Sequence, residues 1–90
     1  MRKSYLEVTF RSGKPLAAYY YLPRNVGDRS AQVKKHRAGL LVDLTADGRP
    51  IGIEIAIPSL VTLEAVNEVL ATYGLDPIEA AELAPLQQAA

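Results

Sequence analysis

Segment 39–57, GLLVDLTADGRPIGIEIAI, constrains the fold more than any other part of this 90-residue chain, because it predicts a β-hairpin. Two runs of alternating apolar residues flank Asp47 and Gly48, a dipeptide that tolerates the positive φ angles of a two-residue turn. With these two residues at the tip, the apolar residues of both strands pair on one face, since side chains alternate along a strand. The expected pairs are Leu44 with Ile51, Val42 with Ile53, and Leu40 with Ile55.

The length of the turn decides the register of this hairpin. A two-residue turn places Pro50 opposite Thr45 at a non-hydrogen-bonded position, where the missing N–H of proline costs nothing. A three-residue turn would instead set Leu44 against Pro50 and Val42 against Gly52, which would mix the two faces. We therefore predict the two-residue turn.

The remaining segments complete a single α+β domain over residues 1–90, a length that suits one small core. Thr62 is a good N-terminal cap, and apolar residues recur after it at intervals of three and four residues. Asp76 and Pro77 are typical of a second, short helix start. We expect a small antiparallel meander of about four strands, with the first helix packed on it. The expected strands cover residues 5–11, 16–22, 39–45 and 50–57, and the expected helices cover residues 62–73 and 77–84.

Two points stay open in the N-terminal half of the chain. A two-residue turn at 13–14 pairs Val8 with Tyr19, whereas a three-residue turn at 12–14 pairs Val8 with Ala18. The polar segment that follows, up to residue 38, forms either a loop or a short edge strand near residues 30–33. The sequence does not decide either point.

The strand expected at 16–22, LAAYYYL, is apolar on both faces. Ala17, Tyr19 and Tyr21 point to one side, and the residues between them point to the other. A strand that is apolar on both sides is normally covered on both sides. One helix covers one face only, so either the sheet curls over itself or a second copy of the chain covers the other face.

Charge is distributed unevenly, although the net charge is zero. Residues 1–38 hold nine of the ten Lys and Arg residues and two of the ten acids, whereas residues 39–90 hold one Arg and eight acids. Opposite halves of this kind neutralise each other when they lie side by side, or they form a surface for polar partners. The basic segment 24–37 is the part of the chain that would contact phosphates.

Composition indicates where the protein resides and which chemistry it lacks. No apolar run approaches the roughly 20 residues of a membrane helix, and the start of the chain shows no signal-peptide pattern. We therefore expect a cytoplasmic protein that makes no membrane contact. The chain has no cysteine, which excludes disulfides and thiolate chemistry.

The hairpin segment resembles the signature of a family of small bacterial proteins, domain of unknown function 2283. Ten residues stand at matching positions: Gly39, Val42, Asp43, Asp47, Gly48, Ile51, Gly52, Ile53, Glu54 and Ile55. Segment 18–22 looks like the strand that precedes this hairpin in the family, whereas the usual N-terminal Y-D-x-x-x-D element is absent. The resemblance implies a small β-meander with a helix, and it implies no activity.

The sequence offers little for catalysis. Glu54 and Asp43 share a hairpin face, and two nearby carboxylates can divide acid and base roles. Strand alternation demands polar residues at these positions in any case. His36 is the only histidine and stands in a basic run, which is unsuited to a metal site. No phosphate-binding loop or zinc spacing occurs, so we predict a non-enzymatic protein without a metal or cofactor.

Two kinds of binding remain. In the favoured hypothesis the chain is a protein-interaction or homodimeric module, whose interface contains Tyr19, Tyr21, Gly52, Glu54 and Ala56. In the alternative it is an accessory protein that binds nucleic acid through Arg24, Arg29, Lys34, Lys35 and Arg37, with tyrosines stacked on bases. The expected helix at 62–73 carries no basic residue, which argues against the alternative.

Overall fold

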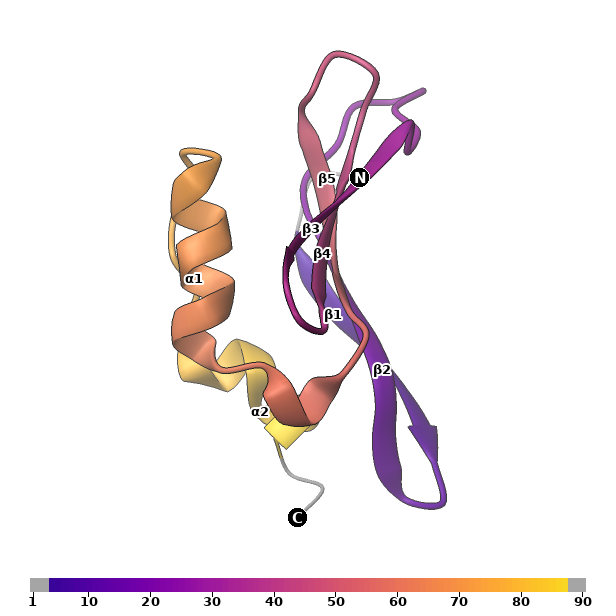
Figure 1. Cartoon of the computed structure of the whole chain (residues 1–90), viewed down its shortest axis with the longest axis vertical. Helices are drawn as coiled ribbons and strands as arrows, with labels where there is room; N and C mark the ends of the chain where they lie inside the picture. The colour runs from indigo at the N-terminus through magenta and orange to yellow at the C-terminus, as the bar shows by residue number, and fades with distance from the viewer. Residues whose placement is uncertain (1–3, 88–90) are drawn as a thin grey trace.

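The computed structural model describes residues 4–87 and shows an α+β fold. Five antiparallel strands form one sheet, and helical segments that follow the last strand lie against one face of it (Figure 1). The strands are β1 (Tyr5–Arg11), β2 (Lys14–Tyr21), β3 (Gln32–Arg37), β4 (Leu40–Leu44) and β5 (Pro50–Ile55). The helical segments are η1 (Pro58–Leu60), α1 (Leu63–Thr72), η2 (Ala80–Leu83) and α2 (Ala84–Gln87). Within the described residues, no helix has the length and apolar character needed to cross a membrane.

The sheet differs from the expected four-strand meander in two respects. The basic segment contributes a fifth strand, β3, at the edge of the sheet, and this strand begins at Gln32. The strand order is β1-β2-β5-β4-β3, so β5 and not β4 is the neighbour of β2. The connection 22–31 carries the chain to the far edge, from which β3, β4 and β5 return toward β2. This path places the apolar strand β5 at the centre of the sheet.

The register of the β4–β5 hairpin is partly as predicted. Val42 pairs with Ile53 and Leu40 pairs with Ile55, which confirms two of the three expected pairs. The third pair is wrong, because Leu44 lies opposite Pro50. A bulge next to this pair makes Ile51 the extra residue of β5 and restores the predicted register beyond it.

The larger turn that causes this bulge is organised by Thr45. Its N–H donates to the carbonyl of Arg49 at 2.9 Å, and its hydroxyl accepts from the Arg49 N–H at 3.0 Å. The Thr45 hydroxyl also donates to the Asp47 carboxylate. A two-residue turn of type I′ needs positive φ at both Asp47 and Gly48, and only Gly48 has it, at 88°. The five residues from Thr45 to Arg49 therefore form the turn.

The β1–β2 hairpin has one of the two registers that the sequence left open. Val8 pairs with Ala18, and Arg11 pairs with Lys14 around a two-residue turn. Ser12 and Gly13 both have positive φ, at 53° and 78°, as a type I′ turn requires. The pairing register shifts between Thr9 and Phe10, so a two-residue turn is compatible with the pairing of Val8 with Ala18.

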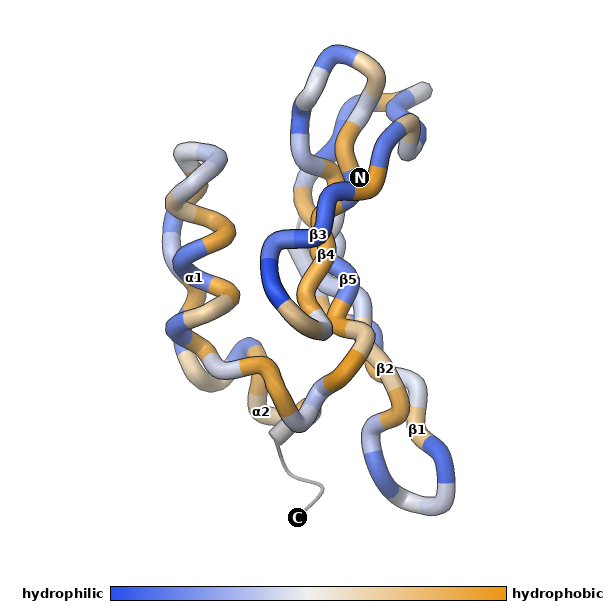
Figure 2. The backbone as a smooth tube through the Cα atoms, in the orientation of Figure 1, coloured by the Kyte–Doolittle hydropathy of each residue, from blue (hydrophilic) through white to orange (hydrophobic). Residues whose placement is uncertain are grey.

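The core lies between the sheet and the helical segments. Residues of the central strands with 3% exposure or less pack with the inner side of α1, and η2 and α2 close one end of this layer. Figure 2 shows the hydrophobic stretches along the central strands and on α1. The most deeply buried members include Tyr20, Leu40, Val42, Ile53, Ile55, Val66, Leu70 and Leu83.

Helix α1 begins as predicted, because the Thr62 hydroxyl accepts from the N–H of Ala65 at 3.1 Å. The second helix begins later than expected, with η2 at Ala80. The cause is Asn67, whose side-chain amide donates to the carbonyl of Ile78 at 3.1 Å and accepts from its N–H at 2.8 Å. These two bonds satisfy the backbone of Ile78 outside a helix and hold the loop before η2 against α1.

Candidate interaction surface

The face of the sheet that points away from the helices carries the candidate site, and we call it the open face. No helical segment among the described residues lies over it (Figure 1). Because directly paired residues point to the same side, the register defines two rows of side chains across this face. From β1 to β3, one row contains Tyr5, Tyr21, Gly52, Asp43 and Val33, and the next contains Glu7, Tyr19, Glu54, Leu41 and Lys35.

Three tyrosines form the aromatic part of the open face. The rings of Tyr5 and Tyr21 stack with centroids 4.4 Å apart, and the edge of Tyr19 meets Tyr21 at 4.6 Å. Both arrangements are favoured by aromatic rings. Tyr5 is 41% exposed, while Tyr19 and Tyr21 are half-buried. The cluster therefore leaves apolar ring surface in contact with solvent.

Carboxylates fix the hydroxyl ends of two of these rings. The Tyr19 hydroxyl donates to Asp43 at 2.7 Å, and the Tyr21 hydroxyl donates to Glu7 at 3.2 Å. Burial, and next the hydrogen bond to Asp43, raise the pKa of Tyr19 well above its usual value. The hydrogen bond to Glu7 is the main cause that raises the pKa of Tyr21. Both phenols stay neutral donors, and their rings keep fixed positions.

Gly52 makes room for one of these rings. A Cβ atom at this position would lie 1.9 Å from the hydroxyl oxygen of Tyr19 and 2.2 Å from the adjacent ring carbon. Glycine therefore lets the Tyr19 ring lie across β5 and reach Asp43 on β4. The space above Gly52 is filled from within the chain, whereas Ala56, directly after β5, is exposed.

Arg24 borders the aromatic cluster on the open face. Its guanidinium carbon lies 5.7 Å from the centroid of the Tyr21 ring, and its Nη2 donates to the carbonyl of Ile51 at 2.8 Å. The Nε atom is buried without a hydrogen-bond partner among the described residues. In the nucleic-acid alternative Arg24 is a phosphate contact, and the structure places it against a tyrosine.

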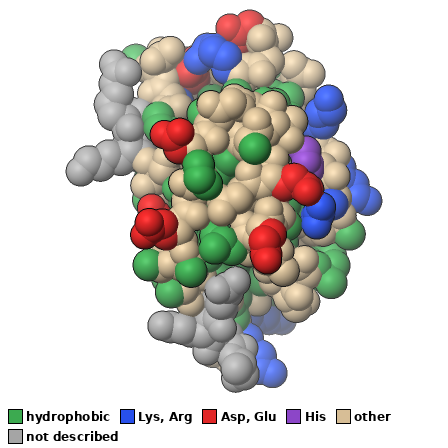
Figure 3. All heavy atoms as spheres, turned by 90° about the vertical axis from the view of Figure 1, so that its left-hand side faces the viewer, with side chains coloured by type: hydrophobic (Ala, Val, Ile, Leu, Met, Phe, Trp, Pro, Cys, Tyr) green, Lys and Arg blue, Asp and Glu red, His purple; other side chains and the backbone are tan. Residues whose placement is uncertain are grey.

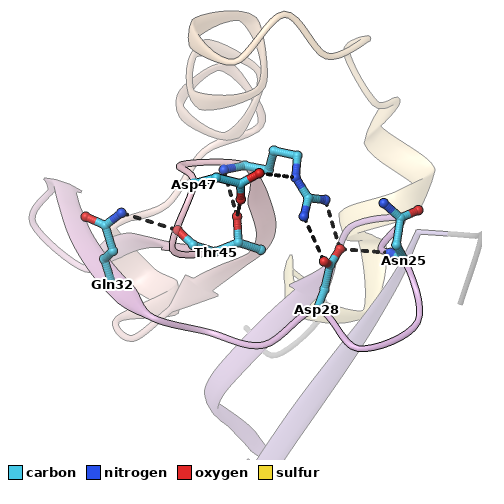
Figure 4. A network of polar contacts seen from close by, with 6 residues as sticks. Asn25, Asp28, Gln32, Thr45 and Asp47 are labelled. Atoms are coloured by element: carbon cyan, nitrogen blue, oxygen red, sulfur yellow. Dashed lines mark hydrogen bonds and ion pairs between the residues drawn. The ribbon is translucent and has the colours of Figure 1, made fainter.

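A polar network holds the segment that carries Arg24 (Figure 4). Arg49, in the β4–β5 turn, donates two hydrogen bonds to the carboxylate of Asp28, at 2.8 and 2.9 Å. The same carboxylate accepts from the N–H of Asn25 at 2.9 Å. The guanidinium of Arg49 lowers the pKa of Asp28 to about 2. Arg49 also binds Asp47 of its own turn at 3.1 Å. Connection 22–31 is tied to the hairpin a second time by the Ala31 N–H, which donates to the carbonyl of Leu44 at 2.8 Å.

The structure does not gather the five predicted phosphate contacts on one surface. In β3, Lys34 pairs with Val42 of the helix-covered face and Lys35 pairs with Leu41 of the open face. Arg37 forms an ion pair of 2.6 Å with Glu68 of α1. Figure 3 views the helix-covered side and shows Lys and Arg side chains beside the histidine at one edge, with acidic side chains scattered among hydrophobic ones across the face. Arg29 lies in the exposed connection.

Asp43 and Glu54, the two carboxylates considered for acid–base chemistry, have different partners. Asp43 accepts a hydrogen bond from Tyr19, and Glu54 pairs with Tyr19 on one side and with Leu41 on the other. Neither cross-strand partner of Glu54 is a histidine, a serine or a carboxylate. No group of three or more metal-ligating side chains, His36 included, is formed by the described residues.

The sequence interpretation missed several members of the open face. Tyr5 joins the aromatic cluster because β1 pairs with β2, and its alternation with Glu7 is visible in the sequence. Leu41 and Val33 complete the face on β4 and β3. Leu41 could have been placed on this face, because it alternates with Leu40 and Val42 in the predicted register. Val33 could not, because its position depends on the presence of β3.

Comparison with protein-family models, with curated proteins and with solved structures finds no match to this chain. The resemblance to domain of unknown function 2283 therefore stays a prediction that rests on the hairpin residues.

Proposed function

We propose that this protein is a non-enzymatic interaction module, and that the open face of its sheet is the binding surface. The observation that carries the proposal is the ordered cluster of Tyr5, Tyr19 and Tyr21 on a sheet face that the helices leave uncovered. Tyrosine is enriched at the centres of protein interfaces because it buries a large area and presents a hydroxyl group.

The rigidity of this face supports the proposal. Two of the tyrosine hydroxyl groups are bound to carboxylates, one from β4 and one from β1, and Arg24 is held over Tyr21 by a backbone carbonyl. A partner that binds such a surface does not have to order these side chains, so less entropy is lost on binding. Leu41 and Val33 extend the apolar surface beyond the rings, and Val33 is 56% exposed.

Affinity capture with matched variants tests the proposal. The tagged protein is incubated with a lysate of its own cells and washed at low and at moderate salt. Glu54→Lys changes the open face, and Glu64→Lys makes the same substitution on the exposed side of α1. We expect a protein, or untagged copies of this chain, to be retained at both salts by the wild type and Glu64→Lys and to be lost with Glu54→Lys.

Nucleic-acid binding gives a different result in the same experiment. Phosphate contacts weaken steeply as salt rises, so nucleic acid would be retained at low salt only. Its loss with a Lys34→Ala/Lys35→Ala variant would favour the alternative function. A chain that retains neither class of molecule and stays monomeric would contradict the proposed interaction module.

A further inference from the structure

The open face consists of two halves with complementary character. The half formed by β2 and β5 is aromatic and acidic, and the half formed by β4 and β3 is aliphatic and basic. Three pairs of residues occupy equivalent positions in the two halves. They are Tyr21 and Val33, Tyr19 and Lys35, and Glu54 and Leu41, with the residue of the first half named first. Two further charged residues are already engaged: Asp43, on the second half, accepts from the Tyr19 hydroxyl, and Arg24, over Tyr21 of the first half, donates to the carbonyl of Ile51.

The two charges at the centre of this pattern are not paired with each other. Lys35 and Glu54 stand in the same row, but Leu41 lies between them. Among the residues that the structure describes, neither the Lys35 ammonium group nor the Glu54 carboxylate forms an ion pair. Glu54 is half-buried between a tyrosine and a leucine, an environment in which a carboxylate gains most from a nearby cation.

From this arrangement we infer that the partner of the open face is a second copy of the same chain, packed face to face about a two-fold axis parallel to the strands. This inference rests on the proposed function and names its partner. An axis through β5 would set Glu54 against Glu54 of the second copy, and like charges at that distance repel. An axis between β5 and β4 exchanges the two halves instead.

With this axis, each half meets the opposite half of the second copy. Aligned sheets pack about 10 Å apart, and neighbouring strands lie about 4.8 Å apart. Lys35 of one copy then lies beside Tyr19 and Glu54 of the other, and Val33 lies beside Tyr21 and the Arg24 guanidinium over its ring. Each contact occurs twice because the interface is symmetric. The lysine thereby gains a cation–π contact and the half-buried carboxylate gains a counter-ion.

Sedimentation velocity at tens of micromolar protein and moderate salt tests the inference with charge reversals. We expect the wild type to sediment as a dimer. Lys35→Glu and Glu54→Lys should each weaken the dimer by roughly tenfold or more, because each sets like charges together twice. The double variant Lys35→Glu/Glu54→Lys should recover most of the affinity, since the pair is restored with its signs exchanged.

Lys34→Glu is the matched control, because this lysine is the neighbour of Lys35 but points to the other side of the sheet. It should leave the dimer unchanged, and circular dichroism confirms that every variant is folded. A monomeric wild type overturns the inference, as does a double variant no tighter than the single variants or a Lys34→Glu effect as large as that of Lys35→Glu. If the monomer nevertheless captures another protein in a Glu54-dependent manner, the proposed function stands and only the second copy is excluded.

Discussion

The two faces of the sheet are built from alternate residues of the same strands, yet different forces hold their side chains. On the helix-covered face, Leu40 and Tyr20 are fixed by packing and have 2% exposure or less. On the open face, their neighbours Leu41 and Tyr19 are half-buried, and hydrogen bonds to carboxylates fix the tyrosines.

The difference shows that a surface can be ordered without being covered. Packing against a helix removes side chains from water and stabilises the fold. The polar links on the open face keep the rings in place while leaving their surfaces accessible. We therefore expect substitutions on the first face to change mainly the free energy of unfolding, and substitutions on the second to change mainly association.

The sharpest form of this comparison uses two adjacent leucines. Leu40→Ala removes a fully buried side chain and should lower the free energy of unfolding by about 3–4 kcal/mol through lost burial and a residual cavity. Leu41→Ala removes the same atoms from the open face and should cost about 1 kcal/mol or less in the monomer. Urea denaturation at low protein concentration measures both values. Equal losses in the two variants would show that the faces do not differ as the structure implies.

The second comparison concerns Gly52, where the open face has no free volume. In Gly52→Ala the new methyl group would overlap the Tyr19 ring, so the ring must move and lose its bond to Asp43. We expect a loss of about 1–3 kcal/mol in the free energy of unfolding. In a Tyr19→Ala background the same substitution should cost much less, because the ring that it meets is absent. Additive effects of Gly52→Ala and Tyr19→Ala would contradict this explanation.

The parts of the fold that could be predicted from sequence are those fixed by local patterns. Alternating apolar residues identified strands β1, β4 and β5, a continuous apolar run identified β2, and Thr62 located the start of α1. Two cross-strand pairs were correct for the same reason. The bulge at Ile51 was not predictable from alternation, because it depends on the hydrogen bonds of Thr45 within the turn.

The parts that could not be predicted depend on contacts between distant segments. The central position of β5 follows from the path of connection 22–31, and the late start of η2 follows from the bonds of Asn67 to Ile78. For the candidate site, the sequence identified Tyr19 and Tyr21 through the two-sided apolar strand, and Glu54 through the alternation of the 39–57 hairpin. It could not show that Arg24 would lie over a tyrosine ring.

The smallest expected effect concerns the rim of the open face, where Asp28 anchors the segment that carries Arg24. The folded-state pKa of Asp28 is about 2, below the usual value of about 3.9. Because folding lowers this pKa, the anchor contributes fully to stability above a pH of about 3.9, and its contribution is lost as the pH falls toward about 2.

An NMR titration of the Asp28 carboxyl carbon measures its pKa directly. Arg49→Met, which removes the guanidinium but keeps much of the side-chain volume, should return that pKa toward its usual value. An Asp28 titration near the usual value in the wild type would contradict the anchor. Since the bond lies outside the core, removing it should change the position of Arg24 on the open face more than the stability of the helix-covered face.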